Sequence, residues 1–256
     1  MIKQAIIPLA GLGTRLLPLT SVLPKELLPI NGKPNLEYIL EECLEAGVRQ
    51  FIFIISKEKI SIKKYFFNDS FYKKIIKKKK DKRIIEEFRK IKKYQKMIKF
   101  VYQNKPKGTG DAVLKTKKYI KDNFFLMLLP DDLIIKKNCS KSMINTHNHY
   151  KSSVMASINV DKKTVSRWGI FELGKKLNKN NHLIKNVIEK PSIIKAPSNK
   201  AVIGRYILSK DIFVKLSKLK PGKSGEIHIT DAIQSLINDD YKFIAHNFVG
   251  EYLDCG

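Results

Sequence analysis

Residues 3–18 read Lys3-Gln4-Ala5-Ile6-Ile7-Pro8-Leu9-Ala10-Gly11-Leu12-Gly13-Thr14-Arg15-Leu16-Leu17-Pro18, and this stretch decides the fold class of the 256-residue chain. Its apolar first part predicts a buried strand from Lys3 to Pro8, and a glycine-rich loop follows directly. Glycines let backbone N–H groups approach an anion closely, and Arg15 adds a fork of donors suited to phosphate. The loop is neither a Walker sequence nor the dinucleotide fingerprint. It therefore predicts another kind of phosphate site, with an unliganded tight turn as the alternative.

Strand-like and helix-like segments alternate along the rest of the chain. Residues 51–56 and 124–129 are almost wholly apolar, which is typical of strands buried on both faces. Residues 35–46 have a helical pattern that stops at Gly47, and a further helix is expected over about 110–120. Further strands are predicted at 98–103, 153–160, 169–173, 183–189 and 201–208. The pattern predicts an α/β fold of Rossmann-like type, with a mixed, mostly parallel sheet flanked by helices.

Composition limits the class of protein. The chain is 43% hydrophobic, which excludes wholesale disorder. Its longest apolar run, 124–129, is far below the ~18 residues of a membrane span, and the N-terminus has no signal-peptide pattern. Three scattered cysteines favour neither a disulfide framework nor a zinc site. We therefore expect a single domain over 1–256, no membrane partner and a cytoplasmic location.

The chain is strongly basic, with 50 Lys+Arg against 24 Asp+Glu and a net charge of +26. Residues 73–99 hold 14 basic and 3 acidic residues, while apolar residues recur there at helical spacing. This indicates an amphipathic helix with a solvated basic face, and an anion-binding surface is the alternative. No RNA-binding aromatic signature or metal-finger spacing accompanies the run, so we expect no nucleic-acid partner.

A lysine between two prolines forms the next motif, Pro24-Lys25-Glu26-Leu27-Leu28-Pro29. The prolines restrict the backbone on both sides of Lys25, so this lysine sits on a stiffened segment. A stiff, partly buried lysine close to a phosphate loop is a candidate for binding a triphosphate. A surface lysine in a proline-rich loop is the alternative.

These motifs resemble the sugar-nucleotide pyrophosphorylases, a family of nucleotidyltransferases that act on sugar 1-phosphates. The resemblance extends from Ile2 to Gly256 and rests on many motifs in order. Besides the two motifs above they are Gln103 with Lys107-Gly108-Thr109-Gly110-Asp111, Leu129-Pro130-Asp131, Gly169, Val187-Ile188-Glu189-Lys190-Pro191, Ile203-Gly204-Arg205-Tyr206, Glu226-Ile227, Ile229-Thr230-Asp231 and Asp254-Cys255-Gly256. An insertion near 70–97 and the Asp-Cys-Gly sequence resemble the uridylyl branch more than the thymidylyl branch.

The resemblance implies the nucleotide-diphospho-sugar transferase fold, with about 1–150 binding nucleotide and about 151–256 binding sugar phosphate. It implies uridylyl transfer from UTP to glucose 1-phosphate, giving UDP-glucose and pyrophosphate. A sugar phosphate oxygen attacks the α-phosphorus in line, so no protein nucleophile is needed and positioning carries the catalysis. His147 and His149 lie in a polar stretch, and we expect both at the surface.

The resemblance also implies residue roles. The catalytic cations are Arg15 and Lys25 at the triphosphate and Lys190 at the sugar phosphate. The implied nucleotide-binding residues are Ala10, Gly11, Gly13, Thr14, Gln103 and Gly108. Gly169 and Glu189 are implied in sugar binding, and Asp131 with Asp254 in binding Mg²⁺. Asp131 also follows a buried strand, where ligands bind in open α/β sheets, whereas Asp132 should point elsewhere.

Members of the family continue for a few dozen residues beyond Asp-Cys-Gly, with helices that support oligomers. We expect this C-terminal helical tail to be missing here, which weakens the expectation of a homo-oligomer. Asn35 also stands where an apolar residue is common. Two alternatives stay open: a transferase for thymidylyl or another sugar, and a shortened inactive homologue that acts as a basic binding protein.

Overall fold

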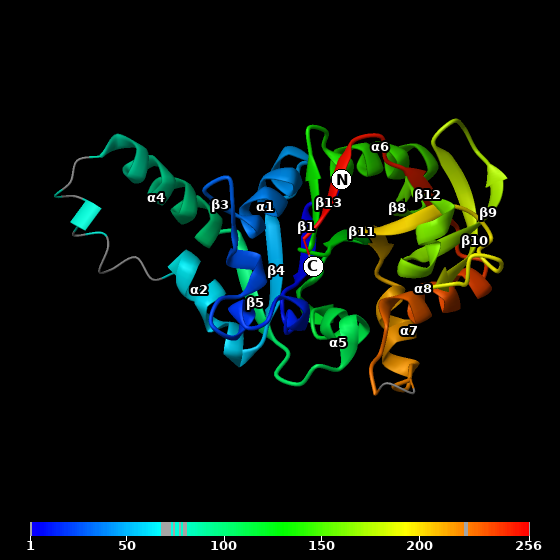
Figure 1. Cartoon of the computed structure of the whole chain (residues 1–256), viewed down its shortest axis with the longest axis horizontal. Coiled ribbons are helices and arrows are strands. Elements are labelled where there is room, and N and C mark those ends of the chain that lie inside the picture. The colour runs from blue at the N-terminus through cyan, green and yellow to red at the C-terminus, as the bar shows by residue number, and fades with distance from the viewer. Residues whose placement is uncertain are drawn as a thin grey trace.

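Nine strands form one continuous sheet in the computed structural model, which describes residues 2–67, 73, 75–76, 78, 81–222 and 225–255 (Figure 1). In spatial order they are β5 (Ile98–Tyr102), β4 (Gln50–Ile55), β1 (Gln4–Pro8), β6 (Phe124–Leu128), β11 (Lys200–Ser209), β8 (Ser153–Asn159), β12 (Phe243–Asn247), β10 (Asn181–Glu189) and β9 (Gly169–Lys176). Strands from both halves of the chain thus share one sheet.

Strand direction confirms the predicted mixed, mostly parallel sheet. Strands β5, β4, β1 and β6 are parallel neighbours, and β12 is parallel to β8. Only β11 and β10 run against the rest of this sheet, since each pairs antiparallel with every neighbour. Parallel strands leave their carboxyl ends, and the loops that follow, at one edge.

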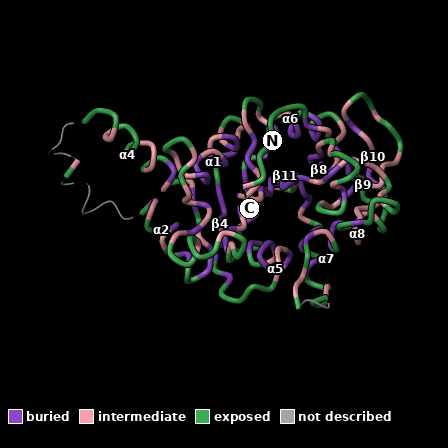
Figure 2. Tube along the Cα trace, in the orientation of Figure 1, coloured by how far each residue is buried: buried purple, intermediate pink, exposed green. Residues whose placement is uncertain are grey.

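Helices cover both faces, because alternate residues of the inner strands point to opposite sides. Ala5 and Ile7 belong to one core cluster with the first group of helices, while Ile6 belongs to the other cluster with the second. The first group is α1 (Asn35–Glu45), α2 (Ile60–Phe67), α4 (Lys82–Gln95) and α6 (Cys139–Tyr150). The second is α5 (Gly108–Leu114), α7 (Ile212–Lys218) and α8 (Ile229–Asn238). Figure 2 shows buried residues concentrated along the sheet.

The predicted elements of the first half are confirmed. The helix predicted over 110–120 is shorter: α5 ends at Leu114, and a separate 3₁₀ turn, Lys117–Tyr119, follows. In the second half the four predicted strands are present, but α7, α8 and β12 were not anticipated, and neither were α2 and α6 in the first half. None of the described helices is long and apolar enough to cross a bilayer.

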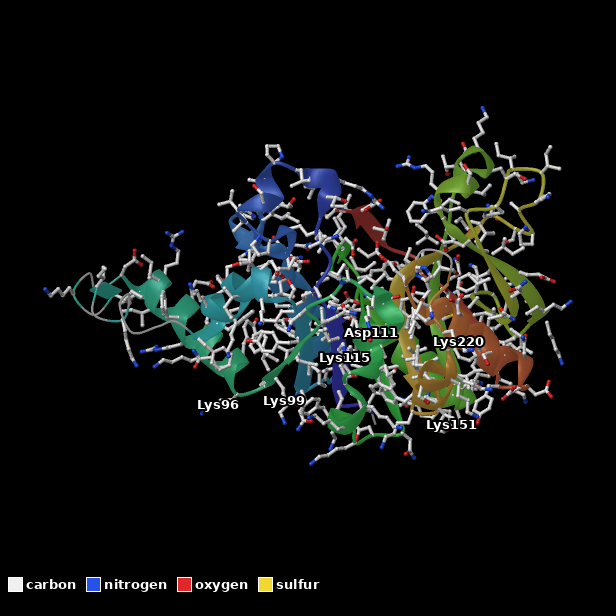
Figure 3. All side chains as sticks on the ribbon, turned by 90° about the horizontal axis from the view of Figure 1, so that it is seen from below. Lys96, Lys99, Asp111, Lys115, Lys151 and Lys220 are labelled. Carbon is white, nitrogen blue, oxygen red and sulfur yellow. The ribbon has the colours of Figure 1, made fainter. Side chains whose placement is uncertain are left out.

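The lysine-rich stretch forms an amphipathic helix where it is described. Helix α4 buries Tyr94 and leaves Lys82, Lys92 and Lys93 exposed, while Lys90 is partly buried in ion pairs with Glu37 and Glu41 of α1. Part of residues 70–97 lies outside the described residues. Lys96, Lys99 and Lys115 are likewise exposed (Figure 3). The structure thus agrees with a solvated basic face.

One surface expectation is wrong. His147 is only 8% exposed: it lies on the buried face of α6, with its ring 4.5 Å from that of Phe124 and Nδ1 2.9 Å from the Ser152 carbonyl oxygen. His149 is exposed, as expected. The two differ because residues two apart on a helix face different sides.

Two small ribbons flank the main sheet. The β2–β3 hairpin joins Pro29–Ile30 to Lys33–Pro34, and β13 (Glu251–Asp254) pairs antiparallel with β7 (Asp132–Ile135). Strand β13 therefore brings the C-terminal residues beside the segment that follows β6 (Figure 1).

His246 gives the fold a pH dependence. It is 5% exposed on β12, where Ser142, Thr146 and Asn181 surround its ring within 3.1 Å. Burial lowers the pKa of His246 from 6.5 to about 4.

We expect stability to fall as pH drops from about 6.5 to about 4. In this window the unfolded chain binds a proton at His246 and the folded chain does not, which costs up to about 3 kcal/mol. Urea unfolding should show a smaller pH dependence for His246→Gln than for the wild type. Parallel curves for the two proteins would contradict the assignment.

Candidate functional site

The loop after β1 is a glycine turn closed by its own backbone. Gly13 has φ +68°, a conformation that disfavours side chains with a Cβ, and the Thr20 hydroxyl donates to its carbonyl at 2.8 Å. The next residues form a 3₁₀ turn, Thr14–Leu16, whose Leu16 N–H also donates to the Gly13 carbonyl. The turn starts at the carboxyl edge of the sheet, where its N–H groups can face a ligand.

The segment between the two prolines presents Lys25 to Asp131. A 3₁₀ turn, Lys25–Leu27, follows Pro24, and its Leu27 N–H donates to the Pro24 carbonyl at 2.9 Å. The Lys25 ammonium lies 2.8 Å from the Asp131 carboxylate, with 15% and 33% of the two side chains exposed. This confirms that Lys25 is partly buried, and it brings together two residues that the sequence motifs assign to the phosphates and to the metal ion.

The neighbouring residue, Glu26, points inward and anchors this turn. Its side chain is 1% exposed, and both carboxylate oxygens accept from the Lys59 ammonium, at 2.7 and 2.8 Å. Burial raises the pKa of Glu26 and lowers that of Lys59, because desolvation outweighs their mutual attraction. The pair ties the turn to the segment following β4.

A cavity of about 400 Å³ opens between these segments. All six predicted nucleotide-binding residues line it, together with Lys25 and Asp131. Those predicted residues are Ala10, Gly11, Gly13, Thr14, Gln103 and Gly108. An adjoining hollow of about 170 Å³ shares Gly13, Lys25 and Asp131 and adds Arg15. The structure therefore brings Arg15, Lys25 and Asp131 to one opening.

Gln103 directly follows β5 at the cavity wall, and Gly108 begins α5. The Gln103 side-chain nitrogen donates to the Gly108 carbonyl at 3.0 Å and to the Asp111 carboxylate at 2.7 Å. With its N–H groups used in this way, the amide oxygen is the group that Gln103 can offer to a ligand. Gly108 has φ +87°, and a Cβ there would lie 2.5 Å from the Ile227 carbonyl oxygen. Glycine is therefore required where two segments cross.

The predicted sugar-side residues lie at one end of the β9–β10 pair. Gly169 and Glu189 are register partners, and the Lys190 N–H donates to the Trp168 carbonyl at 2.9 Å. Lys190 is exposed and has φ +46°, a strained conformation that is frequent at functional sites. None of the three lines the two hollows described above.

Tyr206 connects this end of the sheet to Asp131. Burial raises its pKa, as do the nearby carboxylates of Asp132, Glu189 and Asp131. Glu189 is therefore close enough to the strand end that carries Asp131 for both charges to act on one phenol.

Asp131 and Asp254 come from segments that β13 holds together. The Cα atoms of Asp254 and Asp132 are register partners, and the Cys255 N–H donates to the Asp131 carbonyl at 2.7 Å. In the described part of the chain, no three His, Cys, Asp or Glu side chains gather as a metal cage. Two carboxylates fit Mg²⁺, which typically takes one or two from the protein and the rest from phosphates and water.

The cavity-lining residues to which the sequence analysis gave no role include the polar residues Thr109, Glu226 and His228. The last two come from the second half of the chain. The Ile227 carbonyl accepts from the Gly110 N–H at 2.8 Å, which places this loop over the start of α5. In the sequence, the motif Glu226-Ile227 marked this loop as part of the family pattern, but it did not indicate that the Glu226 side chain faces the cavity.

Asp132 also has a definite place. Its carboxylate accepts from the Gly204 N–H and the Tyr252 hydroxyl. These two contacts hold β7 to β11 and β13.

Comparisons with known proteins point to one family. Residues 4–256 match the nucleotidyl transferase family. The chain is 36% identical, over 100% of its length and 88% of the relative, to UTP–glucose-1-phosphate uridylyltransferase 2 of Staphylococcus saprophyticus. The crystal structure of a UDP-glucose pyrophosphorylase complexed with UDP-glucose superposes with a TM-score of 0.86 at 37% identity, covering all of this chain and 94% of that one. UTP-bound UGPase from Acinetobacter baumannii gives a TM-score of 0.89 at 32% identity, covering 100% and 89%.

The buried Glu26–Lys59 pair predicts an asymmetric mutational response. Lys59→Met leaves the Glu26 carboxylate buried without a partner, and we expect a loss of about 3–5 kcal/mol of unfolding free energy in urea. The double variant Glu26→Met/Lys59→Met should recover most of that loss, because neither charge is then buried. Equal stability of Lys59→Met and the wild type would show that the pair is not buried in solution.

Proposed function

Because the chain belongs to the nucleotidyl transferase family, we propose that it transfers the uridylyl group of UTP to glucose 1-phosphate and releases pyrophosphate. The family and fold predicted from the sequence motifs are confirmed over residues 4–256. Similar proteins that span the whole chain carry the names of uridylyltransferases and UDP-glucose pyrophosphorylases. This supports UTP and glucose 1-phosphate as the substrates.

One observation carries the proposal: the glycine turn, Lys25 and Asp131 face a single cavity next to Arg15. Both substrates are anionic, and two like unit charges ~4 Å apart repel by ~4 kcal/mol at an effective dielectric of 20. The cations of this opening would offset such repulsion and hold the triphosphate.

In the proposed reaction, a phosphate oxygen of glucose 1-phosphate attacks the α-phosphorus of UTP. The new P–O bond forms as the bond from the α-phosphorus to the bridging oxygen breaks, and pyrophosphate leaves. Backbone N–H groups of residues 11–14 and the side chain of Lys25 would bind phosphate oxygens, with Arg15 nearest the departing pyrophosphate. Each of these groups positions reactants and neutralises charge, and none forms a covalent bond with substrate.

Base recognition is assigned to Gln103 and Gly108. The Gln103 amide oxygen would accept from N3–H of uracil. The division into a nucleotide half, about 1–150, and a sugar-phosphate half, about 151–256, is part of this proposal. The presence of Glu226 and His228 in the cavity lining indicates that the second half also reaches the nucleotide.

Sugar phosphate binding is assigned to three residues at the end of β9 and β10. Lys190 would bind the phosphate of glucose 1-phosphate, and Glu189 would accept from glucose hydroxyls above Gly169. Strand β11 pairs both with β6, which leads to Asp131, and with β9, which begins at Gly169, and this supports a common site.

Asp131 and Asp254 would hold Mg²⁺ in this proposal. The bound ion would supply positive charge at the phosphate oxygens. The Lys25 ammonium, 2.8 Å from Asp131, would keep that carboxylate directed into the cavity. The proposed chemistry uses residues of one chain and does not require an oligomer.

The first test is pyrophosphate release by the purified chain from UTP, glucose 1-phosphate and Mg²⁺. For Lys190→Ala we expect about a 10-fold to 100-fold loss in kcat/KM for glucose 1-phosphate, the cost of a hydrogen bond between charged groups. Lys195→Ala removes an exposed lysine five residues away and should change nothing. If both variants behave alike, Lys190 is not the phosphate ligand.

The second test concerns the base. Gln103→Ala should raise KM for UTP and reduce discrimination against CTP, whose ring nitrogen N3 carries no hydrogen to donate. Kinetics with UTP, dTTP and CTP in competition measure both effects. A clear preference of the wild type for dTTP would overturn the uridylyl assignment.

A further inference from the structure

The turn that carries Asp131 is fixed at every backbone carbonyl. It spans residues 129–132, from the end of β6 to the first residue of β7, and each of its four carbonyls accepts a hydrogen bond from another part of the chain. Arg205 donates from Nη1 to the Leu129 carbonyl (3.1 Å) and from Nη2 to the Asp132 carbonyl (2.6 Å). Asn35 donates from Nδ2 to the Pro130 carbonyl (2.6 Å), and the Cys255 N–H donates to the Asp131 carbonyl (2.7 Å). Side chains of only two residues, Arg205 and Asn35, supply three of the four.

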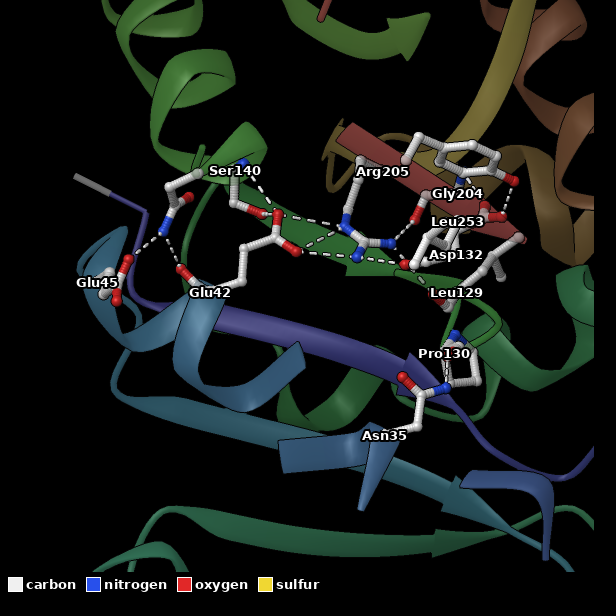
Figure 4. A network of polar contacts seen from close by, with 12 residues as sticks. Asn35, Glu42, Glu45, Leu129, Pro130, Asp132, Ser140, Gly204, Arg205 and Leu253 are labelled. Atoms are coloured by element: carbon white, nitrogen blue, oxygen red, sulfur yellow. Dashed lines mark hydrogen bonds and ion pairs between the residues drawn. The ribbon is translucent and has the colours of Figure 1, made fainter. Parts of the chain in front are cut away.

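Arg205 reaches this turn from β11 through a buried ion pair. Its side chain is fully buried, and Nε and Nη2 bind the Glu42 carboxylate of α1, the shortest contact being 2.8 Å. Nη1 and Nη2 also donate to the Leu129 and Asp132 carbonyls of the turn, and Nη1 donates to the Gly204 carbonyl as well (Figure 4). A guanidinium presents its donors in one rigid plane, so the same group can hold Glu42 on one side and two carbonyls on the other.

Asn35 reaches the turn from the start of α1. It is 4% exposed and donates Nδ2 to the Pro130 carbonyl, while its Oδ1 has no partner in the part of the chain that the structure describes (Figure 4). A buried oxygen without a partner is unfavourable, and an apolar side chain would avoid this cost. The contribution of the amide at this position is therefore its contact with the turn.

We propose that Arg205 and Asn35 are positioning residues, which hold the 129–132 backbone and thereby fix the direction of the Asp131 carboxylate. The inference rests on the proposed function, in which Asp131 is a metal ligand. Neither residue would touch substrate. Groups that orient a metal ligand typically affect metal affinity about 10-fold to 100-fold, which makes the role measurable.

Two variants and one control separate positioning from general stability. Arg205→Lys keeps the charge beside Glu42 but lacks the fork that spans two carbonyls, and Asn35→Ala removes only the donor to Pro130. Ser140→Ala is the matched control, since the Ser140 hydroxyl donates to the same Glu42 carboxylate and does not reach the turn.

The readout is the affinity for MnUTP, measured by electron paramagnetic resonance, with urea unfolding of the same samples. We expect Arg205→Lys and Asn35→Ala to bind MnUTP about tenfold or more weakly than the wild type, and Ser140→Ala to bind it normally even if less stable. Normal MnUTP affinity in folded Asn35→Ala and Arg205→Lys would overturn the inference. If Arg205→Lys does not fold, Asn35→Ala alone decides.

A wild type that neither binds MnUTP nor makes UDP-glucose would instead refute the proposed function, and the inference with it.

Discussion

The ion pair between Lys25 and Asp131 joins two segments that lie 106 residues apart in sequence. Lys25 comes from a proline-bounded turn near the N-terminus, and Asp131 follows an inner strand of the sheet. The cavity lies between these segments, so its shape depends on this contact. Because the pair is only partly buried, both charged groups remain accessible from the cavity.

Buried polar contacts hold each side of that pair in place. Glu26, next to Lys25, is fixed by Lys59, and the backbone around Asp131 is fixed by Arg205 and Asn35. In both cases a charged residue that faces the cavity sits beside a segment tied to the protein interior. This arrangement suits a transfer reaction that uses no covalent enzyme intermediate, because its rate depends on how well charges are placed when substrate binds.

Much of the site can be recognised in the amino-acid sequence. The glycine turn, Lys25, Gln103, Gly108 and Asp131 stand in short motifs whose chemistry is local, and all of them line one cavity. The carboxyl-edge rule also placed Asp131 correctly, since it follows a run of residues buried on both faces. The sequence analysis did not predict that Glu226 and His228 line the cavity. They reach it through a loop that crosses α5, and no local sequence pattern encodes that crossing.

The amino-acid sequence by itself determined the alternation of strands and helices, the glycine turn after β1 and the restricted backbone around Lys25. These depend on periodicity and on the backbone preferences of glycine and proline, which act over a few residues. Only the tertiary structure decided that β10 and β11 run against the other strands, that His147 is buried, and that Arg205 serves the Asp131 turn. Those features depend on contacts between residues far apart in the chain, whose geometry exists only once the sheet has assembled.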